Sequence, residues 1–322
     1  MTDSNPQVLL AGATGYIGRA VAERLLHRGI RHTLLQRQVA DEAPDHELRD
    51  TVVSTLGPEL AQALSQTRPT VVISCLASRT GVPADARAID DEANTRLLNI
   101  AIERGASHFI LLSALCVQKP RLAFQHAKLA FEQRLIDSPL RHSIVRPTAF
   151  FRSLSGQVER VRRGKPFLVF GDGELTACKP IGETDLADYL IDCMHRSDRI
   201  DRILPIGGPG PAMTPLDQAS MLFRLLDRQP SIRRVPAGLL STVATLLDPI
   251  GRLLPSARTR AELARIGHYY ATESMLVWDE EKQRYDAEAT PSTGSRTLED
   301  HYRQVLATGM AGHEAREHRL FD

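Results

Sequence analysis

The sequence predicts an α/β fold, a doubly wound parallel sheet with a smaller C-terminal substrate lobe. Three observations favour it. A strand, a glycine-rich turn and a helix open the chain, short apolar runs alternate with helical patterns up to about residue 150, and turn residues become frequent beyond that point. Strands that helices cover on both faces are apolar along their whole length, as these runs are. We therefore expect two domains, 1–150 and 151–322, with the second partly interleaved with the sheet.

The strands and helices of the first half end at recognisable stop signals. Gly29 and Gly105 follow helical patterns, where glycine readily ends a helix, and Pro147 ends an apolar run. The expected strands are 8–11, 32–37, 51–56, 70–76, 108–113 and 142–146, and the expected helices are 17–28, 89–104 and 123–136.

Turn residues dominate the second half of the chain. Gly164-Lys165-Pro166 and Gly171-Asp172-Gly173 bracket one short apolar run. Glycine and proline make 207–215 a loop, and the polar stretch 280–296 is expected to lie on the surface. The expected strands are 167–170 and 202–206, and the expected helices are 185–195, 216–227 and 239–254, of which the last is apolar enough to cover a pocket or touch a membrane.

The overall composition is ordinary for a soluble globular protein. Of the 322 residues, 42% are hydrophobic and 25% are charged. Forty Lys and Arg against 39 Asp and Glu leave a formal charge of +1, which gives no reason to expect nucleic acid as a partner. Because no window of about 18 residues lacks charge, we expect no integral membrane segment, while peripheral membrane contact stays open.

Cysteine spacing and the N-terminal segment bear on the compartment. Cys75, Cys116, Cys178 and Cys193 are too far apart in the sequence for a metal knuckle or a redox dithiol, which favours a reducing compartment and no bound metal. Residues 1–7 are short and polar, which leaves no room for a targeting peptide before the first strand. We therefore expect a cytoplasmic protein.

The glycine-rich turn is typical of a Rossmann dinucleotide site. The first glycine allows a tight turn after the strand, the second lets backbone N–H groups approach a pyrophosphate, and the third lets the helix pack closely. The helix N-terminus adds aligned donors and a positive dipole end. The turn is Gly12-Ala13-Thr14-Gly15-Tyr16-Ile17-Gly18. Its expected cofactor contacts are Gly12, Thr14, Gly15, Tyr16, Ile17 and Gly18.

The end of the second strand predicts which nicotinamide cofactor binds. An NAD site has a carboxylate about twenty residues after the turn, to hold the ribose 2′-hydroxyl. Here the strand ends in Gln36-Arg37-Gln38, and the first carboxylate, Asp41, lies beyond it. Arg37, with Arg19 from the helix, can bind a 2′-phosphate instead. The hypothesis is that NADPH is the cofactor, unless both arginines are plain surface residues.

The helix after the fifth strand keeps only half of a familiar catalytic pair. Short-chain dehydrogenases use Tyr-x-x-x-Lys, in which the lysine binds the ribose and the tyrosine transfers a proton. This chain has Phe124 and Lys128 at that spacing, so ordinary carbonyl chemistry is disfavoured. Either the fold binds a cofactor without catalysis, or hydride goes to a polarised carbon–carbon double bond. Ser113 lies where the family serine stands, although it would equally serve as a strand cap.

Longer motifs of the second half resemble the NADPH-dependent divinyl chlorophyllide 8-vinyl reductases. The resemblance covers nearly the whole chain and includes the helix that lacks the tyrosine. The motifs that carry it are Pro147-Thr148-Ala149-Phe150-Phe151, Gly156-Gln157-Val158-Glu159, Phe170-Gly171-Asp172-Gly173, Ala177-Cys178-Lys179-Pro180-Ile181, Leu204-Pro205-Ile206-Gly207-Gly208-Pro209-Gly210, Tyr269-Tyr270-Ala271-Thr272-Glu273-Ser274-Met275-Leu276-Val277 and Thr290-Pro291-Ser292.

The resemblance implies a bacterial enzyme of (bacterio)chlorophyll synthesis that reduces the 8-vinyl group of a tetrapyrrole to ethyl with NADPH, with peripheral contact to a pigment-synthesising membrane left open. Cys178 and Lys179 are then candidate proton donors, with Cys178 as plausibly a buried structural thiol. Phe150 and Phe151 would line an apolar cleft, and Arg146 would meet the propionate. Two alternatives stay open: a double-bond reductase for a phenolic or quinone-like substrate, and a non-catalytic NADPH-binding sensor or assembly protein.

Overall fold

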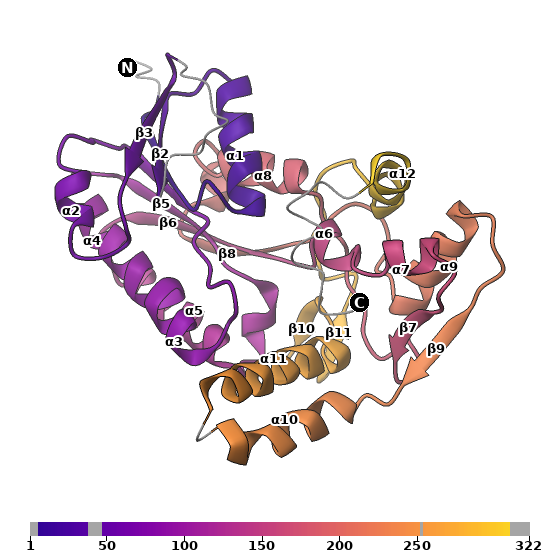
Figure 1. The fold of residues 1–322 in the computed structure, drawn as a ribbon. Coiled ribbons are helices and arrows are strands. Elements are labelled where there is room, and N and C mark those ends of the chain that lie inside the picture. Colours follow the sequence, from indigo (N-terminus) through magenta and orange to yellow (C-terminus); the bar gives the residue numbers. More distant parts are fainter. Residues whose placement is uncertain (1–5, 38–46, 252–253, 310–322) are drawn as a thin grey trace. The chain divides into compact units, whose positions relative to one another are not determined.

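The computed structural model describes residues 6–37, 47–251 and 254–309, and Figure 1 shows its fold. The chain divides into two compact units. The first comprises Met1–Pro147 with Leu186–Leu204, and the second comprises Thr148–Asp185 with Pro205–Asp322. The division into a cofactor domain and a substrate lobe at residue 150 stays a prediction.

A seven-stranded sheet with the order β3-β2-β1-β4-β5-β6-β8 confirms the predicted α/β class. The chain order reverses between β1 and β4, which defines a doubly wound sheet, and each pair from β3 to β6 is parallel. The strands are β1 Val8–Ala11, β2 His32–Gln36, β3 Arg49–Val53, β4 Val71–Ser74, β5 His108–Leu112, β6 Arg141–Pro147 and β8 Arg202–Ile206.

Helices lie on both faces of this sheet (Figure 1). On one face are α2 Leu60–Ala63, α4 Asn94–Glu103 and α5 Ala123–Ile136, and on the other are α1 Tyr16–His27 and α8 Glu183–Asp192. Ion pairs join α1 to α8, since Arg24 and Arg28 both contact Asp188, at 2.8 and 2.6 Å. The buried strand residues, among them Leu9, Val72 and Phe109, form one hydrophobic core with the helices.

The helix expected at 89–104 is longer and less regular than predicted. It begins with α3 Pro83–Ala86, continues as the π-helical segment η1 Arg87–Ala93, and ends as α4. Proline at the first helical position is a start signal that the expected range did not include. The wider π turn leaves no mark in the apolar periodicity, because it depends on tertiary contacts.

The second unit has its own sheet and core. β7 Phe167–Phe170 pairs in parallel with β9 Ile232–Val235. The predicted strand at 167–170 is thus confirmed, and its partner was not predicted. The other elements are α6 Phe151–Leu154, α7 Val158–Arg162, α9 Pro215–Leu225 and α12 Leu298–Thr308, and the core includes Phe151, Phe167, Leu222 and Tyr302. The 3-10 helix η3 Ser197–Arg199, which precedes β8, belongs to the first unit.

The stretch 280–296 is only partly the surface excursion that the sequence predicts. β11 Arg284–Asp286 pairs antiparallel with β10 Val277–Asp279. Thr290 is 1% exposed, and its hydroxyl donates to the carbonyl of Asp286 at 2.7 Å. The prediction was wrong for these residues because polar side chains were assigned to solvent, whereas here they satisfy buried backbone groups.

Two helices that follow β9 pack as a hairpin, α10 Leu239–Gly251 and α11 Pro255–Thr272 (Figure 1). A stripe of exposed apolar side chains runs along α10, and its proposed role as a pocket cover or membrane contact stays a prediction. In the part of the chain that the structure describes, no helix combines the length and the apolar character that a bilayer span requires. The stripe is Leu239, Val243, Leu246 and Ile250.

Candidate functional site

The glycine turn after β1 has the geometry of a nucleotide cradle. Gly12 has φ +82°, and a Cβ there would lie 2.6 Å from the carbonyl oxygen of Cys75. A Cβ on Gly18 would lie 2.0 Å from the carbonyl oxygen of Gly12. Only glycine fits at either position, because a side chain would overlap the neighbouring backbone. The turn closes through a hydrogen bond from the N–H of Gly15 to the oxygen of Gly12, at 3.0 Å.

The first turn of α1 fits the pyrophosphate of a dinucleotide. Gly15 is the N-cap residue, so no side chain covers the helix end, and the first turn holds no acidic residue. Thr14 and Gly15 are exposed, while Ile17 and Gly18 are buried beneath them. Backbone N–H groups and the positive end of the helix dipole therefore point to the surface where an anion can approach.

The two arginines expected to select the cofactor follow the glycine turn and the strand β2. Arg19 is exposed in the first turn of α1, and Arg37 is exposed directly after β2. β1 and β2 are parallel neighbours, with Ala11 opposite Leu35, so their carboxyl ends lie at the same edge of the sheet. Their role toward a 2′-phosphate stays a prediction.

Lys128 lies on α5, and it pairs with a carboxylate that the sequence did not single out. Its Nζ is 2.9 Å from Oδ1 of Asp90 in η1, and the two side chains are 11% and 0% exposed. Phe124, one turn earlier, is buried and has no polar group. The lysine of the expected pair is therefore held by a buried acid.

Ser113, directly after β5, belongs to a second buried network, which centres on Glu132 of α5. Its hydroxyl donates to the carboxylate of Glu132, which also accepts hydrogen bonds from the guanidinium of Arg146. Ser113 is 5% exposed and Glu132 is 2% exposed. Arg146 was expected to meet a propionate; here it neutralises Glu132, so its part in substrate binding stays a prediction.

Two of the expected substrate-side residues are buried in the second unit. Phe151 has no exposed surface and packs against His301, with ring centroids 5.4 Å apart, so this structure places it in the core and not on a pocket wall. Cys178 is 6% exposed, and burial raises the pKa of its thiol to about 12.

Lys179 and Phe150 are less enclosed. Nζ of Lys179 donates to the carbonyl of Thr290 at 2.9 Å, and Phe150 is half-buried beside α6. The described residues contain no cluster of His, Cys, Asp and Glu with the geometry of a metal site.

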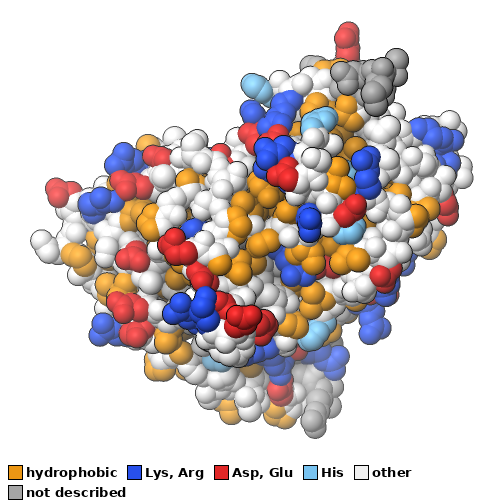
Figure 2. Space-filling view, turned by 180° about the vertical axis from the view of Figure 1, so that it is seen from behind, with side chains coloured by type: hydrophobic (Ala, Val, Ile, Leu, Met, Phe, Trp, Pro, Cys, Tyr) orange, Lys and Arg blue, Asp and Glu red, His pale blue; other side chains and the backbone are white. Residues whose placement is uncertain are grey.

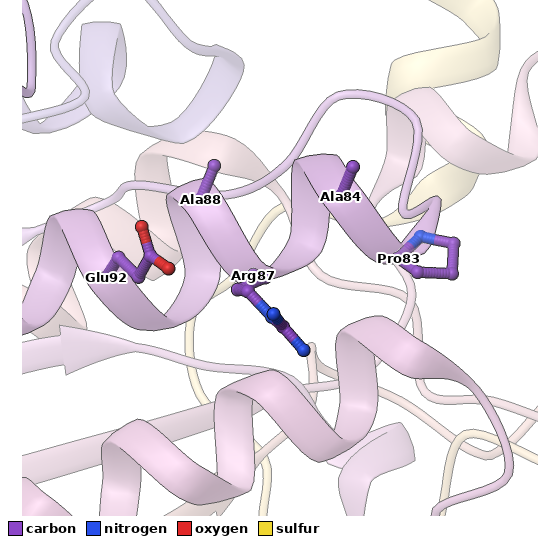
Figure 3. Close-up of a pocket in the computed structure, with 5 residues that line it drawn as sticks. All are labelled: Pro83, Ala84, Arg87, Ala88 and Glu92. Carbon is purple, nitrogen blue, oxygen red and sulfur yellow. The ribbon is translucent and has the colours of Figure 1, made fainter.

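A surface hollow of about 340 Å³ lies elsewhere, along α3 and η1 (Figure 3). All of its lining side chains come from one continuous helical stretch, so no polar groups from different elements converge on it. It contains none of the predicted site residues. The lining residues are Pro83, Ala84, Arg87, Ala88 and Glu92.

Acidic and basic side chains lie intermixed on the face seen in Figure 2. That face carries no broad field of one sign, in keeping with the formal charge of +1. The acids that matter for the site, Asp90 and Glu132, are buried and escaped sequence reasoning. Asp90 stands in the run Asp90-Asp91-Glu92, which is typical of a solvated helix face.

Comparison with known proteins places these features among nucleotide-binding reductases. A family described as NAD(P)H-binding matches residues 12–197. The divinyl chlorophyllide a 8-vinyl-reductase of Cucumis sativus is 46% identical over 98% of this chain and 79% of its own length. That of Zea mays is 44% identical over 99% and 84%. An Escherichia coli NADPH-dependent quinone oxidoreductase, solved with NADPH, has a TM-score of 0.67 at 16% identity over 93% of this chain and 99% of its own.

The relatives also correct the expected location. Both plant reductases are chloroplastic by name. The prediction of a bacterial cytoplasmic protein, with peripheral contact to a pigment-synthesising membrane left open, was therefore wrong as an inference from composition and from residues 1–7. Those features carry no information about the organelle in which a relative works.

Proposed function

The chain belongs to the divinyl chlorophyllide a 8-vinyl-reductase family, and we infer that it reduces the 8-vinyl group of a divinyl chlorophyllide to ethyl in chlorophyll synthesis. The observation that carries this conclusion is an identity of 44 to 46% over nearly the whole chain. The protein is an oxidoreductase that acts on a carbon–carbon double bond and binds a nicotinamide cofactor.

We propose NADPH as that cofactor. The turn from Gly12 to Gly18 binds the pyrophosphate through backbone N–H groups, and Arg19 and Arg37 bind the 2′-phosphate. The support for this choice is the exposure of both guanidinium groups and the lack of a carboxylate at the end of β2, where an NAD site has one. The cofactor supplies the hydride.

Lys128 is proposed to hold the nicotinamide ribose through its ammonium, as a lysine at this spacing does in short-chain dehydrogenases. Phe124 cannot transfer a proton, and the reaction does not require it to. The vinyl group is conjugated with the macrocycle, so the charge left by hydride addition is delocalised over the ring before a proton is added. Ser113 is proposed to act on this reaction as a hydrogen-bond acceptor, because its own proton is donated to Glu132.

Lys179 is the better of the two proposed proton donors. A thiol with a pKa of about 12, as burial gives Cys178, releases its proton too reluctantly near neutral pH. An ammonium group, as on Lys179, carries three donor N–H bonds, of which one is directed to the carbonyl of Thr290. Phe150 and Arg146 are proposed as contacts for the apolar face and the propionate of the tetrapyrrole.

An anaerobic incubation of the protein with divinyl chlorophyllide a and NADPH tests the function directly. We expect a monovinyl product with a blue-shifted Soret band, seen by chromatography and absorption, and much less product with NADH. Product with NADH at equal or greater efficiency contradicts the cofactor proposal. NADPH binding without any product supports instead a non-catalytic sensor or assembly protein. Turnover of quinones or phenols alone supports a double-bond reductase for such substrates.

A further inference from the structure

Asp90 carries a buried charge that depends on Lys128. Its Oδ1 lies 2.9 Å from Nζ of Lys128 and accepts a hydrogen bond at 3.3 Å from the backbone N–H of Ser78, in the loop after β4. Its Oδ2 is buried and has no hydrogen-bond partner among the described residues. A buried carboxylate with one unsatisfied oxygen is costly unless a cation compensates it, and Lys128 is that cation.

The π-helical segment anchors Asp90 to the edge of the sheet. The amide of Asn94 donates to the carbonyl oxygens of Ile89 and Asp90, at 3.1 and 3.2 Å, which joins the side chain of Asn94 to the π-helical segment. The hydroxyl of Ser74, at the end of β4, donates to Asn94 at 2.6 Å. Asp90 is therefore linked to the carboxyl end of β4. The chain order reverses between β4 and its neighbour β1, and doubly wound folds bind nucleotides at such a switch point.

We propose that Asp90 is a positioning residue that holds the ammonium of Lys128 toward the nicotinamide ribose. This inference rests on the proposed function, in which Lys128 contacts that ribose. An ammonium has three N–H donors; one is directed to Asp90 and two are left for ribose hydroxyls. Phe124 offers no oxygen that can share the task, so the carboxylate of Asp90 aligns the lysine from the opposite side.

Asp91 provides a matched control on the same π-helical segment. It pairs with Arg134, which like Lys128 belongs to α5, but both members of this pair reach solvent, at 20% and 48% exposure. Asp91→Asn removes the same charge from the next residue and breaks an ion pair between the same two elements. It touches neither Lys128 nor the turn after β1.

NADPH binding without tetrapyrrole, followed by the fluorescence of the reduced nicotinamide, is the first measurement. We expect Asp90→Asn to raise the Kd about tenfold, as loss of a charged hydrogen bond does, and Asp91→Asn to leave it unchanged. Because Asp90 acts through Lys128, adding Lys128→Met to Asp90→Asn should weaken binding little further. Full additivity of the two losses, or an equal effect of Asp91→Asn, overturns the inference.

Acylation of lysines measures directly how strongly Asp90 restrains Lys128. The chain has five lysines, and peptide mapping separates Lys128 from the exposed Lys165. Asp90→Asn removes the ion pair that holds the Lys128 side chain in its largely enclosed position, so acylation of Lys128 should speed up about tenfold relative to Lys165. Asp90→Glu keeps the charge and should retain the slow rate. This second variant decides the matter where Asp90→Asn fails to fold, and fast acylation in it counts against the inference.

The two proposals fail in different ways. Unchanged NADPH binding in Lys128→Met removes the ribose contact of Lys128, and with it this inference, but leaves the 8-vinyl reduction standing. Weaker binding in Lys128→Met together with normal binding in Asp90→Asn overturns the role of Asp90 alone.

Discussion

The hydroxyl of Ser113 donates to the carboxylate of Glu132, one turn beyond Lys128 on α5. Glu132 also accepts from Arg146, so a serine at the end of β5 and an arginine in β6 share one buried acid. Lys128 and Glu132, four residues apart, thus take part in two separate buried ion pairs. Ser113 and Lys128, the two polar side chains that the sequence placed nearest to the reacting atoms, are therefore each paired with a buried carboxylate.

Replacing Ser113 by alanine should lower stability more than activity. Glu132 loses one of its donors in a buried site, which costs about 1–3 kcal/mol of unfolding free energy. Since the hydroxyl proton is already donated to Glu132, we expect kcat/KM to fall less than tenfold. Urea unfolding and the NADPH-dependent assay measure the two effects. A loss of more than a hundredfold with unchanged stability would instead assign Ser113 to the reacting substrate.

Alanine at Gly15 and at Gly18 should have different effects. A Cβ at Gly15 lies 3.3 Å from the oxygen of Gly12, a contact that a small shift relieves, whereas at Gly18 it lies 2.0 Å from the same atom. Gly15→Ala should keep the fold and weaken NADPH binding about tenfold, because the methyl group lies where the pyrophosphate approaches. Gly18→Ala should also lose roughly 1–3 kcal/mol of stability. Calorimetry and cofactor titration distinguish the two; equal stability would contradict the packing argument.

Arg37→Gln should reduce the preference for NADPH. Loss of a charge-assisted bond to the 2′-phosphate should lower kcat/KM with NADPH roughly tenfold or more and leave NADH kinetics unchanged. Arg31→Gln is the control, since Arg31 precedes the same strand and contacts Asp50 at 3.8 Å. Parallel losses with both cofactors would show that Arg37 does not read the 2′-phosphate.

Stability should fall as the pH drops from about 6.5 to about 4, in part because of His108. Burial, followed by the positive charge of Arg141, lowers its pKa from 6.5 to about 4. Ser143 donates its proton to the carbonyl of Arg199, so Nε2 of neutral His108 is the donor in its 2.9 Å bond to Ser143. Between these pH values the unfolded chain binds a proton that the native chain does not. The unfolding free energy therefore falls by up to about 1.4 kcal/mol for each pH unit of acidification.

The variant His108→Asn tests this pH dependence. Asparagine keeps a donor for Ser143 and cannot titrate, so its unfolding free energy should change less between pH 7 and pH 4.5 than that of the unmodified protein. His27→Asn, at an exposed position on α1, should leave the pH profile as it is. An unaltered profile in His108→Asn would assign the acid sensitivity to other groups.

Local rules were sufficient for the first half of the fold. The strands at 8–11 and 108–113, the glycine turn and the helix at 123–136 were predicted nearly to their ends, because each shows a continuous apolar run or a helical period, and glycine or proline lies close to one of its ends. The second half was less accessible. β9 has exposed side chains over most of its length, and α11 lacks a clear apolar stripe, so neither differs locally from loop.

The sequence by itself determined the α/β class, the dinucleotide turn and the family. A glycine needed for backbone approach and a long run of shared residues can both be recognised from the order of the residues alone. Tertiary structure alone decided what the site residues touch. Asp90 looks like part of a solvated acidic run, and only the π turn and the packing of α5 bury it against Lys128. Glu132, Ser113 and Arg146 lie on three different elements, so no spacing in the sequence relates them. Burial and pairing depend on which elements meet in space, and that is set by the whole fold.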